Sequence, residues 1–281
     1  LVTKDELWGF NNSLPYFSPN DQFISFSAFR NFEQEIMLYN TQTKKTINLT
    51  NTSITETDPM WSQDGKYIYF TSSRLKPSYP FGIQNARIYR LPLENIDEPY
   101  RGDKFTELFK EEKKDTSKKV IVKTDEVINI DMDRIMDRLE LVGPSFGSQA
   151  IVSLYQKGDK LTVFYSSNHS EGKPALWKTV IEPFEENKIE KIAGTDGASS
   201  FQVITVNDKF FLLTKGNIMK LNVETNKIDP VNISYTFRRN LQAEFSQMFE
   251  EAWAQMEINY YDENFHGINW ASIKEKYRPF I

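Results

Sequence analysis

Alternating apolar and polar residues recur at a regular spacing along the first 235 residues. Two stretches, 15–30 and 59–74, align residue by residue with an offset of 44 positions. Each has an aromatic residue, a serine, a polar turn and then an alternating apolar strand, and a second strand is expected after each, at 36–39 and 87–91. A period of this length with several strands per unit is typical of β-propeller blades.

Later units have diverged but keep the order of strand, hairpin turn and strand. Further strands are expected at 150–155, 161–165, 175–181, 201–206, 209–214 and 217–223. We therefore expect an all-β propeller of about four blades. An open arc of four blades would leave strand edges unpaired, so we expect it to be part of a six- or seven-bladed ring. The other blades would lie upstream of Leu1, or a partner would cover the edge.

The periodicity changes from that of strands to that of helices after residue 240. Apolar residues recur at helical spacing in a broad stripe: Leu241, Phe245, Met248, Phe249, Ala252, Trp253 and Met256. Gly267 suits the turn that follows, Asn269 is a candidate N-cap for a second helix through Tyr277, and Pro279 would end it. The sequence thus predicts two domains, a propeller over 1–235 and a short α-helical segment over 236–281.

Composition excludes several classes of function. The chain has 39 acidic and 34 basic residues and a net charge of −5, so we expect no nucleic-acid partner. It has no cysteine, which excludes disulfides, thiolate metal sites and a cysteine nucleophile. No apolar run approaches the roughly 18 residues of a membrane span, so no membrane insertion is expected. The charged tract at 101–119 is interpreted as a solvated insertion between strands.

The helical segment carries a family resemblance. The residues concerned are Glu244, Gln247-Met248-Phe249, Glu251-Ala252-Trp253, Tyr260-Tyr261-Asp262, His266-Gly267, Asn269-Trp270 and Tyr277. This stretch resembles the one by which tricorn-type serine peptidases join a propeller to their catalytic part, although the family's usual Asp is Asn269 here. The segment 128–141 resembles the propeller of the same family, but more loosely. The first two repeats resemble TolB-type propeller repeats.

The resemblance implies the front part of a longer serine endopeptidase that degrades oligopeptides, with the propeller gating access. Peptide substrates, the rest of the parent polypeptide and other copies in a homo-oligomer would be its partners, and no cofactor is implied. The family's nucleophile and base come later in the chain, so this chain is expected to be inactive alone, and whether it is itself an enzyme stays open. The family implies the cytoplasm, or the periplasm if an upstream signal peptide exists.

The residues themselves offer little catalytic chemistry, and we assign no catalytic, cofactor-binding or metal-binding residue. There is no Ser-His dipeptide, and we expect no Gly-x-Ser-x-Gly nucleophile elbow. His169 is interpreted as a surface-loop residue and His266 as part of the turn between the helices. The acidic residues Asp131, Asp133, Asp137 and Glu140 cluster in sequence, but no histidine joins them, so surface carboxylates are expected.

Two alternatives stay open. One is a stand-alone TolB-like propeller that acts as a protein- or peptide-binding module, and the other is the N-terminal propeller of a prolyl-oligopeptidase-like enzyme. The apolar stripe around Phe249 and Trp253 disfavours the first, because a terminal helix should have something to cover it. The helical segment disfavours the second. The gene sequence beyond Ile281 would distinguish the three.

Overall fold

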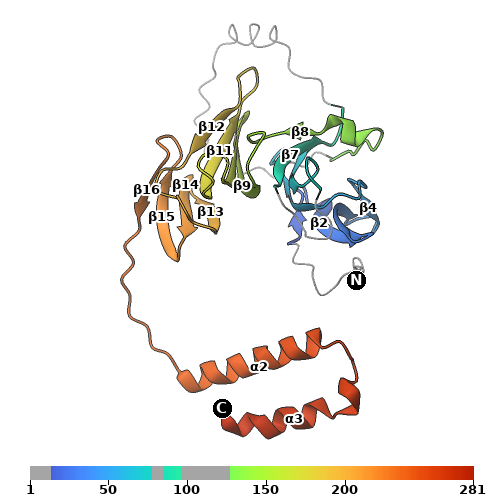
Figure 1. Cartoon of the computed structure of the whole chain (residues 1–281), viewed down its shortest axis with the longest axis vertical. Coiled ribbons are helices and arrows are strands. Elements are labelled where there is room, and N and C mark those ends of the chain that lie inside the picture. Colours follow the sequence, from blue (N-terminus) through green and yellow to red (C-terminus); the bar gives the residue numbers. More distant parts are fainter. Residues whose placement is uncertain (1–13, 78–84, 96–126) are drawn as a thin grey trace. The chain divides into compact units, whose positions relative to one another are not determined.

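The described part of the chain forms four small β-sheets followed by a pair of helices (Figure 1). The computed structural model describes residues 14–77, 85–95 and 127–281, so the charged tract at 101–119 lies outside the described residues. The chain divides into two compact units, Leu1–Val231 and Asn232–Ile281. The predicted class, propeller blades followed by a helical segment, is confirmed.

Each sheet is an antiparallel meander of four strands that follow one another in the chain. Blades 1 and 2 consist of β1 (Tyr16–Phe17), β2 (Phe23–Arg30), β3 (Glu33–Asn40), β4 (Thr46–Asn48), β5 (Glu56–Trp61), β6 (Tyr67–Ser72), β7 (Arg87–Pro92) and β8 (Glu140–Leu141). Blades 3 and 4 consist of β9 (Gln149–Lys157), β10 (Lys160–Ser167), β11 (Ala175–Ile181), β12 (Lys188–Lys191), β13 (Phe201–Val206), β14 (Lys209–Thr214), β15 (Asn217–Asn222) and β16 (Lys227–Pro230). The size of a complete ring stays a prediction.

The sequence repeat corresponds to a repeated turn at the first hairpin of blades 1 and 2. Buried serines occupy the same place in both, and the Ser18 and Ser62 hydroxyls accept the N–H groups of Phe23 at 2.9 Å and of Tyr67 at 3.0 Å. Gly65, in the second turn, has a φ of 71°, as the Asp-Gly pair predicts. The two serines therefore satisfy buried backbone donors where each turn leads into its strand.

The apolar core lies between the blades. Ile36 and Leu38 of blade 1 pack in one cluster with Ile68, Phe70 and Leu91 of blade 2, and all five are fully buried. Similar clusters lie between blades 2 and 3 and between blades 3 and 4. Burying one such side chain contributes about 1.5–3 kcal/mol, so contact between the faces of neighbouring sheets is the main source of stability.

The helical unit contains α2 (Leu241–Asn259), η3 (Phe265–Gly267), α3 (Trp270–Tyr277) and η4 (Arg278–Phe280). The side chain of Asn269 accepts the N–H of Ser272 at 3.0 Å, which confirms the predicted N-cap. Asn240, which the sequence reading did not identify, caps α2 in the same way. The α-helix changes to a 3₁₀ turn at Arg278, next to Pro279. None of the described helices is long and apolar enough to cross a membrane.

Glu56 is a buried ionisable residue at the junction of blades 1 and 2. The side chain of Glu56, at the start of β5, is fully buried, and its Oε2 has no hydrogen-bond partner. Its Oε1 lies 3.8 Å from Arg74 and accepts the Thr52 hydroxyl at 3.3 Å. The pKa of this carboxyl is raised to about 7, chiefly by burial. Glu35 also raises this pKa, whereas Thr50, Arg74 and Thr52 lower it.

We predict that Glu56 makes the stability of the propeller depend on pH. The pKa is higher in the folded state than its ordinary value of 4.5, so the stability linked to this group is complete below about pH 4.5 and is lost as the pH rises through about 7. Between pH 5 and pH 8, wild type should lose on the order of 2–3 kcal/mol of unfolding free energy relative to Glu56→Gln, as measured by urea unfolding.

Glu186→Gln, at an exposed loop position, is the matched control and should keep the pH dependence of wild type. If Glu56→Gln shows the same slope of unfolding free energy against pH as wild type and Glu186→Gln, the buried carboxyl does not titrate in this range and the prediction is wrong.

Candidate functional site

The first strand of each blade lies on the inner side of the blade series. Strands β1, β5, β9 and β13 contact one another from blade to blade, whereas the fourth strands contact chiefly the third strand of their own sheet. This is the arrangement in which first strands surround the axis of a propeller. These inner strands include the exposed side chain of Phe17.

His169 follows β10 and is more enclosed than a surface-loop histidine. Its Nδ1 lies 2.8 Å from the hydroxyl oxygen of Ser167, and its ring packs between Trp177 and Phe146 at centroid distances of 4.1 and 5.7 Å. Burial lowers the pKa of the imidazole. Ser167 is itself buried, so its hydroxyl has no open approach for a substrate. The pair therefore has the contacts of a structural hydrogen bond and lacks the access that a nucleophile needs.

The expectation that the chain has no Gly-x-Ser-x-Gly pattern is wrong, because residues Gly143–Gly147 have this pattern. It lies in a loop between strands β8 and β9, whereas a nucleophile elbow joins a strand to a helix. Packing accounts for both glycines. A Cβ on Gly143 would lie 2.5 Å from Gln149, and one on Gly147 would lie 2.6 Å from His169. Ser145 is exposed between them, and the loop has no elbow geometry.

His266 occupies the turn between the helices, as the sequence predicts. Its Nδ1 lies 3.2 Å from the carboxylate of Asp262, its Nε2 contacts the hydroxyl of Tyr261, and its own N–H donates to Asp262 at 2.7 Å. The N–H groups of Asn264 and of His266 lower the pKa of Asp262. Because Tyr261 and His266 are both exposed, these contacts hold the turn in shape and enclose no space for a substrate.

The acidic residues near 131–140 are separated by arginines. Asp137 pairs with Arg134 at 2.6 Å, Asp131 pairs with Arg138 at 3.4 Å, and Glu140 pairs with Arg90 on β7. Part of the segment folds as a 3₁₀ turn, η2 (Ile135–Arg138). The carboxylates thus point to separate cations, and among the described residues no group of three histidine, cysteine or acidic side chains is placed to hold a metal ion.

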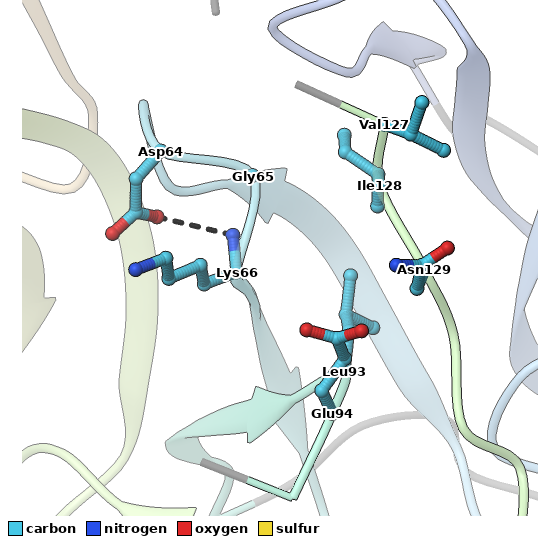
Figure 2. A pocket seen from close by; sticks show the side chains of 8 residues that line it. All are labelled: Asp64, Gly65, Lys66, Leu93, Glu94, Val127, Ile128 and Asn129. Atoms are coloured by element: carbon cyan, nitrogen blue, oxygen red, sulfur yellow. Dashed lines mark hydrogen bonds between the residues drawn. The ribbon is translucent and has the colours of Figure 1, made fainter.

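A small pocket lies beside the first hairpin of blade 2 (Figure 2). It has a volume of about 60 Å³ and is lined by Asp64, Gly65, Lys66, Leu93, Glu94, Val127, Ile128 and Asn129. Asp64 accepts the N–H of Lys66, and the backbone of Ile128 is held by the side chain of Gln22. A space of this size suits a few water molecules and is far below the several hundred Å³ of a typical ligand site.

The two helices are held together by stacked aromatic rings and an ion-pair cluster. Trp253 on α2 is buried and stacks on Trp270 of α3 at a centroid distance of 4.3 Å. Glu250 on α2 reaches Lys274 at 2.6 Å and Arg278 at 2.8 Å. These contacts cover one flank of α2 only, because Leu241, Phe245, Met248 and Met256 stay exposed. Most of the predicted apolar stripe is therefore uncovered within this unit.

Comparisons with known proteins place these features in a family context. The family model for the tricorn protease C1 domain matches residues 241–281. A second family model, for eukaryotic translation initiation factor eIF2A, matches residues 9–83. No curated protein sequence matches the chain significantly. The predicted resemblance of the helical segment to tricorn-type peptidases is confirmed.

Solved structures extend the likeness to the propeller. A crystal structure of the tricorn protease matches 94% of this chain with a TM-score of 0.61 and 17% identity. The chain spans 26% of that tricorn protease chain. TolB from Acinetobacter baumannii matches 80% of this chain and 45% of its own, with a TM-score of 0.47 and 14% identity. At these identities the likeness shows the fold alone, and the TolB match is too weak to support an argument.

We predict that Trp270→Ala loosens the helical unit and leaves the blades unchanged. The substitution removes the stacking partner of both Trp253 and Phe265, and we expect a loss of about 2–4 kcal/mol for a partly buried tryptophan. Amide hydrogen exchange in α2 should accelerate at least tenfold, whereas amides in β6 and β10 should keep their protection.

Tyr277→Ala is the control on the same helix, because its side chain is half exposed. It should change α2 exchange less than threefold. Equal exchange rates in Trp270→Ala and wild type would show that the stacked rings do not hold the helices together.

Proposed function

We propose that this chain supplies a propeller and the adjoining helices of a tricorn-like serine peptidase that degrades oligopeptides. The observation that carries the proposal is the match of α2, η3 and α3 to the tricorn protease C1 model, directly after blades whose fold is that of the tricorn protease. A chain of this family would have the same order, blades followed by C1-type helices, where its propeller joins its catalytic part.

The propeller would control which molecules reach the catalytic centre. Its first strands lie next to one another and would line the axial passage, and the strand ladders on either side would keep that passage narrow. An unfolded peptide fits such a passage, whereas a folded protein does not. Peptide substrates, the remaining catalytic polypeptide and other copies in a homo-oligomer are the partners that this role requires.

The helical unit would connect the gate to the catalytic residues. The stacked pair Trp253 and Trp270, with Glu250 bridging to α3, makes a rigid hairpin. The exposed apolar side chains of α2 would then dock on the catalytic half. Hydrolysis itself is assigned to residues outside this chain, because Ser145, Ser167, His169 and His266 lie in structural contacts or exposed loops that form no nucleophile–base pair with an oxyanion site.

We predict activity in the complete product of the encoding gene and none in the 281-residue chain. The complete product should react with a fluorophosphonate probe and should cleave unstructured peptides of about ten residues but not a stably folded protein. Ser145→Ala, His169→Ala and His266→Ala, made in the complete product, should each keep kcat/KM for the peptide within about threefold of wild type.

Two outcomes would contradict the proposal. One is peptide hydrolysis by the 281-residue chain that Ser145→Ala or His169→Ala abolishes, because the catalytic site would then lie in the propeller. The other is a complete product that neither reacts with the probe nor cleaves peptides, which would favour a propeller that only binds its partner.

A further inference from the structure

A β-bulge interrupts β5, the inner strand of blade 2. The register between β5 and β6 shifts after Thr57, so that two residues, Asp58 and Pro59, lie opposite one residue of β6. A bulge of this kind bends its strand and redirects a side chain. The bulge is anchored to blade 1, because the buried hydroxyl of Ser25 donates to the carbonyl oxygen of Pro59 at 3.5 Å.

Asp58 has an unusual backbone conformation for its position. Its φ is 56°, in the left-handed region, although a residue that precedes a proline favours an extended conformation. Residues held in such conformations concentrate at functional sites. Asp58 is therefore a candidate for a role beyond that of its strand.

Blade 3 shows that a bulge in an inner strand does not by itself require these features. The register between β9 and β10 also shifts, and the extra residue there is Val152. Val152 is half-buried against the core between blades 3 and 4, and its φ is not positive. The curvature of an inner strand thus accounts for a bulge, and it leaves the acid and the left-handed backbone at Asp58 unexplained.

The carboxylate of Asp58 is exposed and has no cation beside it. The hydroxyl of Thr57 donates to it at 3.0 Å, and among the described residues no lysine, arginine or histidine forms an ion pair with it. Asp137 and Glu140, by contrast, each pair with an arginine. The negative charge of Asp58 is thus available to a ligand.

The adjoining inner strand supplies aromatic side chains. Tyr16 and Phe17 form β1, which contacts β5. Burial raises the pKa of the Tyr16 phenol, and the charge of Asp58 raises it further, so these two groups lie near each other. Phe17 is 59% exposed. A carboxylate and aromatic rings on adjoining strands suit a cationic group, which pairs with the acid and lies favourably over a ring face.

We propose that Asp58, on the bulge of β5, binds a primary ammonium group of a peptide and so gives the inner strands a preference for cationic peptides. Either a lysine side chain or the N-terminus of the peptide supplies this group. The inference rests on the proposed function, in which the inner strands line a peptide passage, and it adds a class of substrate to that role. Because the attraction is electrostatic, added salt should weaken it.

Peptide binding to the complete gene product tests the inference, after treatment with a fluorophosphonate that prevents turnover. Fluorescence anisotropy compares an unstructured peptide that has one lysine and a free N-terminus with its neutral form, N-acetylated and with glutamine in place of the lysine. At low salt, wild type should bind the cationic peptide about fivefold more tightly than the neutral one, and Asp58→Asn should remove the preference. Asparagine also tolerates the left-handed conformation, so blade 2 should keep its fold.

Peptides changed at only one of the two cationic groups show which group Asp58 binds. Glu186→Gln, which removes a charge from an exposed loop of blade 3, is the matched control and should keep the preference of wild type. Equal affinities of wild type for the cationic and the neutral peptide would overturn the inference. So would an equal loss of preference in Asp58→Asn and Glu186→Gln, because the net negative charge of the chain would then account for the attraction.

The failure of this inference and the failure of the proposed function give different results. A complete product that cleaves peptides but has no preference dependent on Asp58 contradicts only the inference. A complete product that neither reacts with the fluorophosphonate nor cleaves peptides, yet binds cationic peptides through Asp58, contradicts only the peptidase assignment and leaves the binding site in place.

Discussion

The structure of the blade unit depends on one constraint, that each small sheet has to be covered on its apolar faces. A four-stranded meander of two- to nine-residue strands buries little by itself, so its hydrogen-bond ladders are stable only when a neighbouring sheet excludes water from them. Ile36, Leu38 and Phe70 show the result, since side chains from two separate meanders become fully buried in one cluster. Ser18, Ser62 and Gly65 shape the first hairpins of blades 1 and 2. The packing of sheet against sheet then stabilises the blade unit.

The helical unit meets the same requirement by a different route. Two short helices cannot enclose a core, so α3 covers only the flank of α2 that carries Trp253, and Glu250 adds charge-assisted contacts at the rim. Surface ion pairs of this kind contribute little alone, which leaves the stacked rings as the principal contact. The rest of the apolar face of α2 stays exposed within this unit.

Packing and catalysis can require the same residue types, and this chain illustrates how they are told apart. Gly143 and Gly147 fit the spacing of a nucleophile elbow, yet each is a glycine because a side chain there would collide with Gln149 or with His169. His169 and Ser167 form a short hydrogen bond, but the serine is buried and the imidazole is enclosed by aromatic rings. A catalytic assignment needs access and an oxyanion site in addition to the residue pair.

The sequence by itself determined the features that depend on neighbours in the chain. Strand alternation, the 44-residue repeat with its Asp-Gly turn, the helical stripe and the Asn269 cap all act over a few residues, so their signals are local. Only the tertiary structure decided the others. Strand β8 pairs with β7 across about fifty intervening residues, Glu56 is buried because two blades meet around it, and His169 is enclosed by Phe146 and Trp177 from other segments. The environment of each comes from residues distant in sequence, and no local pattern specifies which faces of the sheets will meet.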